Sequence, residues 1–176
     1  TTAVVWFRRD LRLHDHAALT AAIEGHDRVV PLFVLDPRLL EGRFASPVRT
    51  WFMLESLREL SASLAALGAP LVIRTGDPAD ELAAVCASTG ARDVYVSRDH
   101  APYGRGRDTR VAERLAAAGV AFHPKRGLLI HEPEDVATAQ GGSFSVYSPF
   151  LRAWERLERR AVLARPSRMA GHDLEP

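Results

Sequence analysis

Hydrophobic and polar positions alternate in a regular way along the chain. Short runs of β-branched and aromatic residues are separated by longer segments rich in Ala, Leu and Arg. The short runs predict buried strands, and the longer segments predict helices. The predicted strands cover residues 3–7, 28–34, 71–74, 94–97 and 120–123. This order predicts an α/β fold with a doubly wound, Rossmann-like parallel sheet of five strands, and right-handed crossovers favour the strand order 3-2-1-4-5.

Capping residues mark where the helical segments begin and end. Ser46-Pro47 and Asp77-Pro78 each place a capping side chain before a proline in the first turn. Asp15 stands where it could cap the helix after the first strand, and Gly68 follows a helical run as a C-terminal stop. The helices with such signals are predicted at 47–67, 78–89 and 104–118, with a last one from 148 to 163.

Two stretches lack this periodicity. Residues 127–148 contain Gly141-Gly142 and predict a connecting loop that leads to the last helix. Residues 165–176 have the composition of a linker. We therefore expect one α/β domain over residues 1–164 and the start of an interdomain linker over residues 165–176.

The composition is typical of a single globular domain. The chain has 176 residues, of which 47% are hydrophobic and 26% charged, and its net charge is only +1. These values exclude a disordered chain. Its apolar runs are too short for a transmembrane helix, so no membrane partner is expected. The single Cys86 cannot form an internal disulfide, and the first residues lack a signal-peptide pattern, so a cytoplasmic location is expected.

Charged residues follow three of the predicted strands. In an open parallel sheet, ligands bind beyond the carboxyl ends of the strands, where the strand order reverses. In the predicted order, this switch point lies between the first and fourth strands, which Arg8 and Asp99 follow, while Asp36 follows the second. Arginine and carboxylate groups around one crevice suit a planar ligand with several polar edges. The alternative is that these are solvated loop charges.

The remaining motifs carry little chemistry. His14-Asp15-His16 has two imidazoles, but their spacing at a helix start does not bring them onto one metal ion. Residues 103–108 resemble a phosphate-binding glycine loop but lack its third glycine, because Thr109 stands there. Cys86 lies in an apolar helical pattern typical of a buried structural residue. The residues therefore predict no catalytic constellation and no metal site.

Four blocks of sequence resemble the N-terminal domain of the DNA photolyase and cryptochrome family. Residues 6–15 (WFRRDLRLHD) resemble the opening of these proteins. Residues 32–37 resemble their second strand, and residues 103–108 resemble the loop into the crossover after the fourth strand. Residues 145–150 are similar to the segment that leads out of this domain. The resemblance extends over most of the chain.

This resemblance implies a light-harvesting, chromophore-binding domain of a deoxyribodipyrimidine photolyase. Photolyases use blue or near-ultraviolet light to split cyclobutane pyrimidine dimers in DNA. An antenna chromophore in the N-terminal domain passes excitation to FAD in a larger helical C-terminal domain, and the cofactors carry the chemistry. Nothing in this chain matches the FAD-binding domain. Its expected partners are therefore that domain and, through it, damaged DNA, and the chain alone is expected to have no catalytic residues and no repair activity.

The resemblance also implies where the antenna chromophore binds. The matching residues lie at the ends of the first, second and fourth strands and on the helix after the second, namely Phe7, Arg8, Phe33, Val34, Leu35, Asp36, Arg49, Asp99, Tyr103 and Gly104. Asp99 would accept a hydrogen bond from a ring N–H or hydroxyl, and Arg8 and Arg49 would hold carbonyl or anionic oxygens.

The same positions bear on which chromophore binds. Members that bind folate resemble one another in an Asn-Glu pair where this chain has Tyr103-Gly104, which disfavours methenyltetrahydrofolate. Residues 99–105 look more like the members that use a deazaflavin or FMN, and we favour 8-hydroxydeazaflavin over FMN. Two other functions fit the same sequence: the N-terminal domain of a cryptochrome photoreceptor, and a stand-alone nucleotide-binding α/β module.

Overall fold

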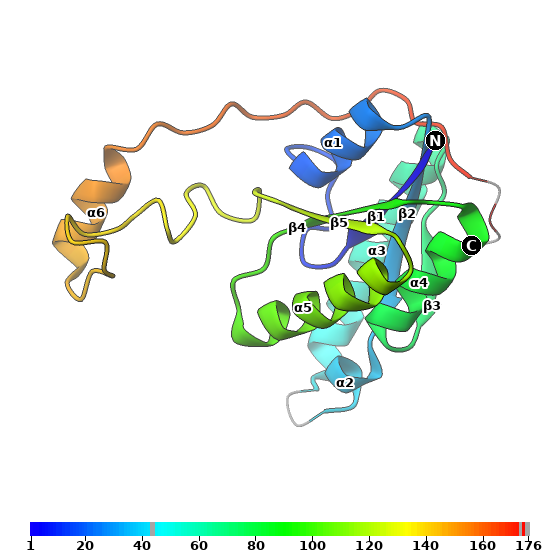
Figure 1. Ribbon diagram of the computed structural model, residues 1–176, viewed down its shortest axis with the longest axis horizontal. Helices are drawn as coiled ribbons and strands as arrows, with labels where there is room; N and C mark the ends of the chain where they lie inside the picture. Colours follow the sequence, from blue (N-terminus) through cyan, green and yellow to red (C-terminus); the bar gives the residue numbers. More distant parts are fainter. Residues whose placement is uncertain (43–44, 173, 175–176) are drawn as a thin grey trace.

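A five-stranded sheet forms the centre of the computed structural model, which describes residues 1–42, 45–172 and 174. All four strand pairs are parallel, and the order is β3-β2-β1-β4-β5 (Figure 1). The strands are β1 (Thr2–Phe7), β2 (Arg28–Leu35), β3 (Val72–Thr75), β4 (Asp93–Ser97) and β5 (Ala121–Lys125). The predicted fold class and strand order are confirmed, and each predicted strand lies within about two residues of an observed one.

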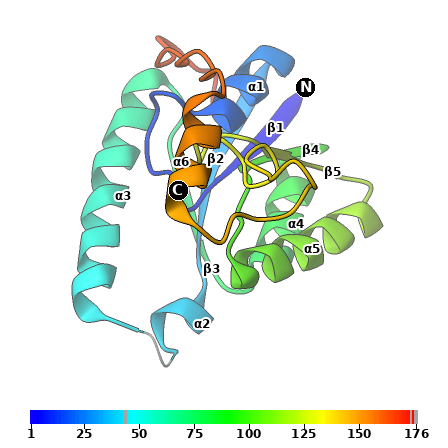
Figure 2. The same ribbon diagram turned by 90° about the vertical axis from the view of Figure 1, so that its left-hand side faces the viewer.

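Helices cover both faces of this sheet, as Figure 2 shows with the strands between α3 and the pair α4 and α5. The helices are α1 (Ala17–Gly25), α2 (Pro37–Leu40), α3 (Pro47–Leu67), α4 (Pro78–Thr89), α5 (Pro102–Ala117) and α6 (Tyr147–Glu155). Helices α1 and α3 pack on one face, and α4 and α5 pack on the other. Helix α6 lies apart from both layers (Figure 1).

The alternation of side chains along β1 explains why its sequence is a continuous hydrophobic run. Ala3, Val5 and Phe7 point into the core under α1 and α3. Val4 and Trp6 point into the core under α4 and α5. A strand covered on both faces has no position for an exposed polar residue, which is the usual pattern in a parallel sheet.

Several predicted helix ends are confirmed, and one cap is corrected. Asp77 caps α4 by accepting the N–H of Ala79 at 2.8 Å, and Gly68 ends α3 with a φ of +95°. Ser46 occupies the N-cap position of α3 without a side-chain cap hydrogen bond. The expectation that Asp15 caps α1 is wrong, because Nδ1 of His16 accepts the N–H of Leu19 there at 3.1 Å.

The last two predicted helices differ from the observed ones at their ends. Helix α5 begins at Pro102, two residues before the predicted start, because proline suits the first turn of a helix. Helix α6 ends at Glu155, so the residues from Leu157 to Leu163, predicted to be helical, follow it as irregular chain. No side chain of α6 is buried, so tertiary packing does not extend this helix beyond its nine residues.

The stretch predicted to be a linker packs on the domain. Met169 is only 5% exposed and belongs to the core under α1 and α3. Its N–H donates to the carbonyl of Leu67 at 2.8 Å, and the carbonyl of Ala170 accepts from the N–H of Val29 at 2.8 Å. The closing segment, residues 166–171, is therefore part of this core rather than a detached linker. That it leads to a further domain stays a prediction.

Residues 127–163 form an arm that extends from the carboxyl end of β5, carries α6 at its tip and returns to the domain (Figure 1). Residues 127–146 are turns and irregular chain, which confirms the predicted loop. Within the described residues, no helix is both long and apolar enough to cross a membrane.

Candidate functional site

The guanidinium of Arg8 lies between β1 and β4, where the strand order reverses. It donates to the carboxylate of Asp108 on α5 and to the carbonyl of Ser97 at the end of β4. Its carbon Cζ lies 4.6 Å from the centroid of the Trp6 ring, which places the cation over an aromatic face. Arg8 therefore links three elements at the predicted switch point.

A second buried arginine, Arg107 on α5, completes this charged cluster. One of its terminal nitrogens lies 3.3 Å from Asp99 and 3.0 Å from Asp108. Its Cζ lies 5.0 Å from the Trp6 ring, so two guanidinium groups share one aromatic side chain. Arg107 is not among the residues predicted to form the site. The only signal in the sequence is that Arg107 follows Asp99 by eight residues, within a predicted helix. This spacing does not show that the Arg107 side chain is buried.

Burial and neighbouring charges act in opposite directions on these groups. Burial and the nearby Arg107 cation lower the pKa of Arg8, although Asp108 raises it. Burial raises the pKa of Asp99, but the N–H of Ala101 and the cations of Arg8 and Arg107 outweigh it, so the pKa of this carboxyl lies below its ordinary value. Asp99 is therefore a carboxylate, the form that accepts hydrogen bonds.

Gly104 has a steric role beside Asp99. A Cβ atom on Gly104 would lie 2.3 Å from Cγ and 2.3 Å from Oδ2 of Asp99. The first turn of α5 therefore lies against this carboxylate only because residue 104 has no side chain. Gly104 therefore contributes to the predicted site by leaving room for the carboxylate of Asp99.

Asp36 and Tyr103 form a second polar pair near this charged cluster. The Tyr103 hydroxyl donates to Oδ2 of Asp36 at 2.7 Å. Oδ1 of Asp36 accepts from the N–H of Arg38 at 3.0 Å, which caps α2. Burial and the hydrogen bond to Asp36 raise the pKa of the Tyr103 hydroxyl. This bond connects the end of β2 to the start of α5 across the carboxyl end of β1.

The other predicted residues are dispersed around this cluster. Phe7 and Phe33 belong to the core under α1 and α3, and Val34 belongs to the core on the opposite face. Arg49 is exposed in the first turns of α3. Leu35 lines a cavity of about 520 Å³ between α3 and β3.

Asp99 lines a different cavity from that of Leu35. It has a volume of about 320 Å³ and is lined by Arg9, Arg12, Asp99, His100, Ala101, Leu128 and Leu129. The two cavities have no lining residue in common. The structure therefore brings Arg8, Asp36, Asp99, Tyr103 and Gly104 together at one edge of the sheet, but it does not place all the predicted residues around one open cavity.

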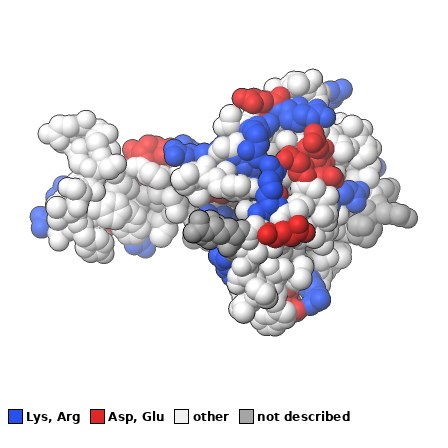
Figure 3. Space-filling view, turned by 90° about the horizontal axis from the view of Figure 1, so that it is seen from below, with Lys and Arg blue, Asp and Glu red and all other residues white. Residues whose placement is uncertain are grey.

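Charged side chains are visible on the face seen from below in Figure 3. Lys and Arg form a band across this face, with Asp and Glu gathered mainly along one side of the band. Because the two signs lie side by side, this face is not a uniformly basic surface. That agrees with the net charge of +1.

Two groups of residues have side chains of the kinds that bind metal ions. In the His14-Asp15-His16 segment, Asp15 pairs with Arg160 and His16 faces Asp10, so their side chains do not converge. His100, Glu132 and Glu134 do approach one another closely. However, Arg98 pairs with Glu134 and lies 3.5 Å from Glu132, and Arg126 lies 3.8 Å from Glu134, so two protein cations already offset the charge of these carboxylates.

Comparisons with known proteins agree with the fold. The family profile described as DNA photolyase matches residues 3–167. A deoxyribodipyrimidine photo-lyase of Synechococcus is 33% identical over 97% of this chain and 35% of that protein. Cryptochrome-1 of Arabidopsis thaliana is 36% identical over 88% of this chain and 22% of that protein.

Solved structures show the same relationship. A class III photolyase from Agrobacterium tumefaciens has a TM-score of 0.89 and 33% identity, over 99% of this chain and 36% of that one. A cryptochrome of Synechocystis has a TM-score of 0.88 and 25% identity, over 97% of this chain and 37% of that one. The chain thus spans about a third or less of these relatives. It belongs to the DNA photolyase family and corresponds to the N-terminal α/β domain of its members.

Proposed function

We propose that this chain is the light-harvesting domain of a deoxyribodipyrimidine photolyase and that the switch-point crevice holds its antenna chromophore. The observation that carries the proposal is the burial of four charged side chains at the point where the strand order reverses. The side chains of Arg8, Asp36, Asp99 and Arg107 are between 3% and 8% exposed. Burying a charged side chain is costly unless an opposite charge lies beside it. Buried pairs of arginine and carboxylate at the switch point, where ligands bind in parallel sheets, therefore support a binding role.

The donor and acceptor types in the crevice fit a chromophore of the deazaflavin or flavin class. The carboxylate of Asp36 already accepts a hydrogen bond from an aromatic hydroxyl, that of Tyr103. A ring N–H or hydroxyl of the chromophore would use the same acceptor once Tyr103 turns away. Asp99 would be a second acceptor, and Arg49 would hold anionic oxygens from the side of α3. When bound, the chromophore supplies absorption of blue or near-ultraviolet light and transfer of that excitation.

Among antenna chromophores, the proposal favours 8-hydroxydeazaflavin over FMN and disfavours folate. Tyr103-Gly104 supports this choice, because Gly104 leaves room only for the carboxylate of Asp99 and Tyr103 places a hydroxyl on Asp36. FAD and damaged DNA would be bound by the C-terminal portion that the relatives possess. We place the protein in the cytoplasm, in line with its single cysteine, Cys86, which is buried and free. Burial and the nearby Asp93 raise the pKa of this thiol to about 11.

A cryptochrome photoreceptor is the second candidate. It is supported by 36% identity to Arabidopsis cryptochrome-1 and by the TM-score of 0.88 with the Synechocystis cryptochrome. Relatives of both kinds match most of this chain, so the match itself does not separate the two candidates. A photorepair assay on the whole protein distinguishes them, because only a photolyase converts pyrimidine dimers under blue light.

Absorption titrations of the purified chain test antenna binding directly. We expect a saturable red shift with 8-hydroxydeazaflavin, a weaker response with FMN and none with methenyltetrahydrofolate. Arg49→Ala and Asp36→Asn should each weaken binding by about tenfold, the usual effect of losing one charged hydrogen-bond partner. Arg114→Ala is the matched control, because Arg114 is also an arginine with an exposed side chain and pairs with Asp80, away from the predicted site residues. Saturation by none of the three chromophores would contradict the proposal.

A further inference from the structure

Helix α3 has an outer face, opposite its core face, on which residues recur with a heptad spacing. The core face consists of Leu57, Leu60 and Leu64. The outer face follows alternating steps of three and four residues, through Val48, Trp51, Glu55, Arg58, Ala62 and Ala65. This spacing places them along one stripe, as in the seam of a coiled coil. In Figure 2, α3 forms one margin of the molecule, and every other labelled element lies on one side of it.

The large apolar side chains of this outer face are exposed. Val48 is 74% exposed and Trp51 is 62% exposed, and Phe52, at the edge of the stripe, is 68% exposed. Contiguous apolar side chains of this kind mark an interaction site more often than scattered ones do. Tryptophan is also among the residues that contribute most to binding energy at interfaces. The outer face therefore has the chemistry of an interface.

The order of side chains along the stripe makes it complementary to itself in an antiparallel pair. In such a pair, each a position of one helix faces a d position of the other. Val48 then faces Ala65 of the second copy, and Trp51 faces Ala62, so large side chains lie on small, exposed ones. A parallel pair would instead place each Trp51 against its own counterpart. The large and small halves of the outer face therefore select the antiparallel arrangement.

The charges at the middle of the stripe select the same arrangement. Within one chain, Arg58 donates to Glu55, and both side chains are exposed, by 71% and 41%. In the antiparallel pair, Glu55 faces Arg58 of the second copy, so two carboxylates and two guanidiniums surround the two-fold axis. A parallel pair would bring like charges together at both positions, which is destabilising. Charge complementarity therefore identifies a second copy of this chain as the partner.

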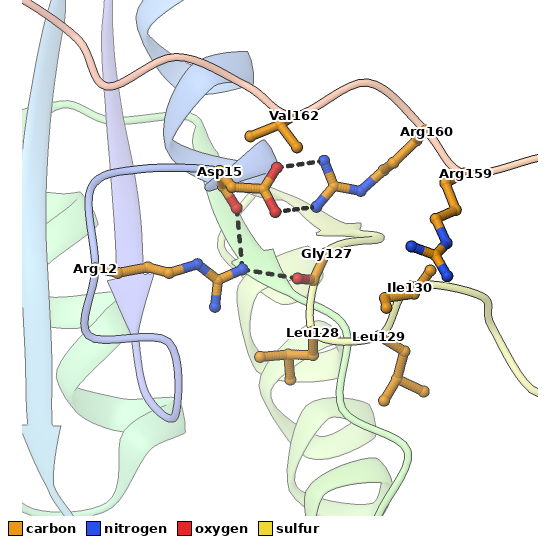
Figure 4. A pocket seen from close by; sticks show the side chains of 9 residues that line it. All are labelled: Arg12, Asp15, Gly127, Leu128, Leu129, Ile130, Arg159, Arg160 and Val162. Carbon is orange, nitrogen blue, oxygen red and sulfur yellow. Dashed lines mark hydrogen bonds and ion pairs between the residues drawn. The ribbon is translucent and has the colours of Figure 1, made fainter.

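A different exposed apolar surface lies on the arm. Leu129, Ile130 and Val162 are exposed and line a cavity of about 310 Å³ beside the pair formed by Asp15 and Arg160 (Figure 4). These residues come from two irregular segments of chain, so they form no helical stripe that a second copy could match. This surface therefore provides control positions for the outer face of α3.

We propose that two copies of this chain form a symmetric dimer through the outer faces of α3, packed antiparallel. The stripe from Val48 to Ala65 is about 27 Å long at the usual helical rise. Covering both copies of Trp51 would remove roughly 200–300 Å² of aromatic surface from water. One helix pair is smaller than a standard interface of about 1,600 Å², so we expect a dissociation constant in the micromolar range. The inference does not rest on chromophore binding.

Sedimentation equilibrium of the purified chain between about 1 and 300 µM tests the dimer. We expect a reversible equilibrium between monomer and dimer. Trp51→Glu puts a carboxylate into an apolar layer and should raise the dissociation constant at least about tenfold. Val162→Glu is the matched control, because Val162 is 67% exposed on the arm, and it should leave the constant unchanged. Circular dichroism checks that both variants keep the fold.

Charge exchange tests the orientation of the two helices. Glu55→Arg alone and Arg58→Glu alone each place like charges in facing positions, so each should raise the dissociation constant about tenfold. The two substitutions together restore opposite charges and should return the constant to within about threefold of wild type. In a parallel pair, like charges already face each other in wild type, so the single exchanges would change little.

Disulfide cross-linking tests the register. Val48→Cys with Ala65→Cys should give covalent dimers on mild oxidation, whereas Val48→Cys alone should not, because the two copies of position 48 lie at opposite ends of the pair. A chain that stays monomeric up to about 300 µM would overturn the proposal. A dimer that Trp51→Glu leaves intact would also overturn it, since its interface would lie elsewhere. So would cross-linking of Val48→Cys alone, which requires parallel helices.

Discussion

Nε2 of His16 lies 2.9 Å from Oδ2 of Asp10, and both side chains are almost completely buried. Because Nδ1 of His16 accepts the N–H of Leu19, that nitrogen carries no proton, and the imidazole proton is on Nε2, facing the carboxylate. Oδ1 of Asp10 accepts the N–H of Arg8 at 3.1 Å. The pair therefore joins the start of α1 to the residues that follow β1, including Arg8 of the predicted site.

Asp10→Asn should destabilise the protein by about 1–3 kcal/mol, because the amide nitrogen of Asn cannot accept a hydrogen bond and one buried donor loses its partner. Urea unfolding near neutral pH measures the change. Asp80→Asn is the control, since Asp80 is 73% exposed and should change the unfolding free energy by less than about 0.5 kcal/mol.

The same variant tests the pH dependence of stability. Burial raises the pKa of Asp10, but hydrogen bonds from His16, Ser97 and the N–H of Arg8 outweigh it, so the folded-state pKa lies well below the ordinary 3.8. Such a carboxyl stabilises the fold fully above about pH 4, and this contribution is lost as the pH falls towards the folded-state pKa. Wild type should therefore lose unfolding free energy more steeply than Asp10→Asn on acidification below about pH 4. Parallel curves would contradict this assignment.

Gly104→Ala should destabilise the protein by about 1–3 kcal/mol, because the new Cβ would overlap the carboxylate of Asp99 and displace it from Arg107. Gly106→Ala is a matched control in the same helix, since a Cβ there meets nothing within 4 Å. It should stabilise α5 by about 0.5–1 kcal/mol through helix propensity. Thermal unfolding of the two variants should therefore shift in opposite directions.

The hydroxyl of Tyr103 should titrate above the ordinary tyrosine pKa of 10.0, because burial and the bond to Asp36 disfavour its ionised form. Asp36→Asn removes the carboxylate charge and should bring this pKa closer to the ordinary value. Ultraviolet difference spectra at alkaline pH measure the ionisation, and Tyr103→Phe identifies which part of the signal belongs to this residue. A Tyr103 pKa that Asp36→Asn leaves unchanged would show that burial alone causes the shift.

Met169→Ala should lower the unfolding free energy by about 2–5 kcal/mol, the usual range for a large buried side chain that leaves a cavity. The neighbouring Arg168→Ala is the control, because Arg168 is exposed. Guanidinium unfolding measures both. An equally small effect of the two substitutions would mean that the closing segment lies on the surface in solution.

The sequence predicts the centre of the sheet well because β1, β2 and β4 are buried along most of their length. The run from Ala3 to Phe7 can only be a buried strand, and the order of strands follows from short right-handed crossovers. The start of α5 was missed by two residues because Ala101, its N-cap, makes no side-chain cap hydrogen bond. Helix α2 was not predicted, because four residues carry no periodic signal.

The site was predictable where it follows directly from strand ends and was missed where it depends on distant contacts. Arg8, Asp36 and Asp99 follow the strands, so topology alone places them at one edge of the sheet. Arg107 joins them because one turn of α5 happens to face Trp6. In the sequence, His16 is considered only with His14 as a possible metal ligand, because no local pattern reveals that its ring is buried against Asp10.

Met169 has a consequence for the order in which the domain folds. The residues that it joins, near Val29 and Leu67, are synthesised long before it, and the hydrogen bond between Val29 and Ala170 closes a loop of more than half the chain. Contacts between residues so far apart in the sequence form late, since the loop-closure entropy is lost before they form. We therefore expect the part of the core that Met169 covers to stay exposed during synthesis until the closing segment has left the ribosome.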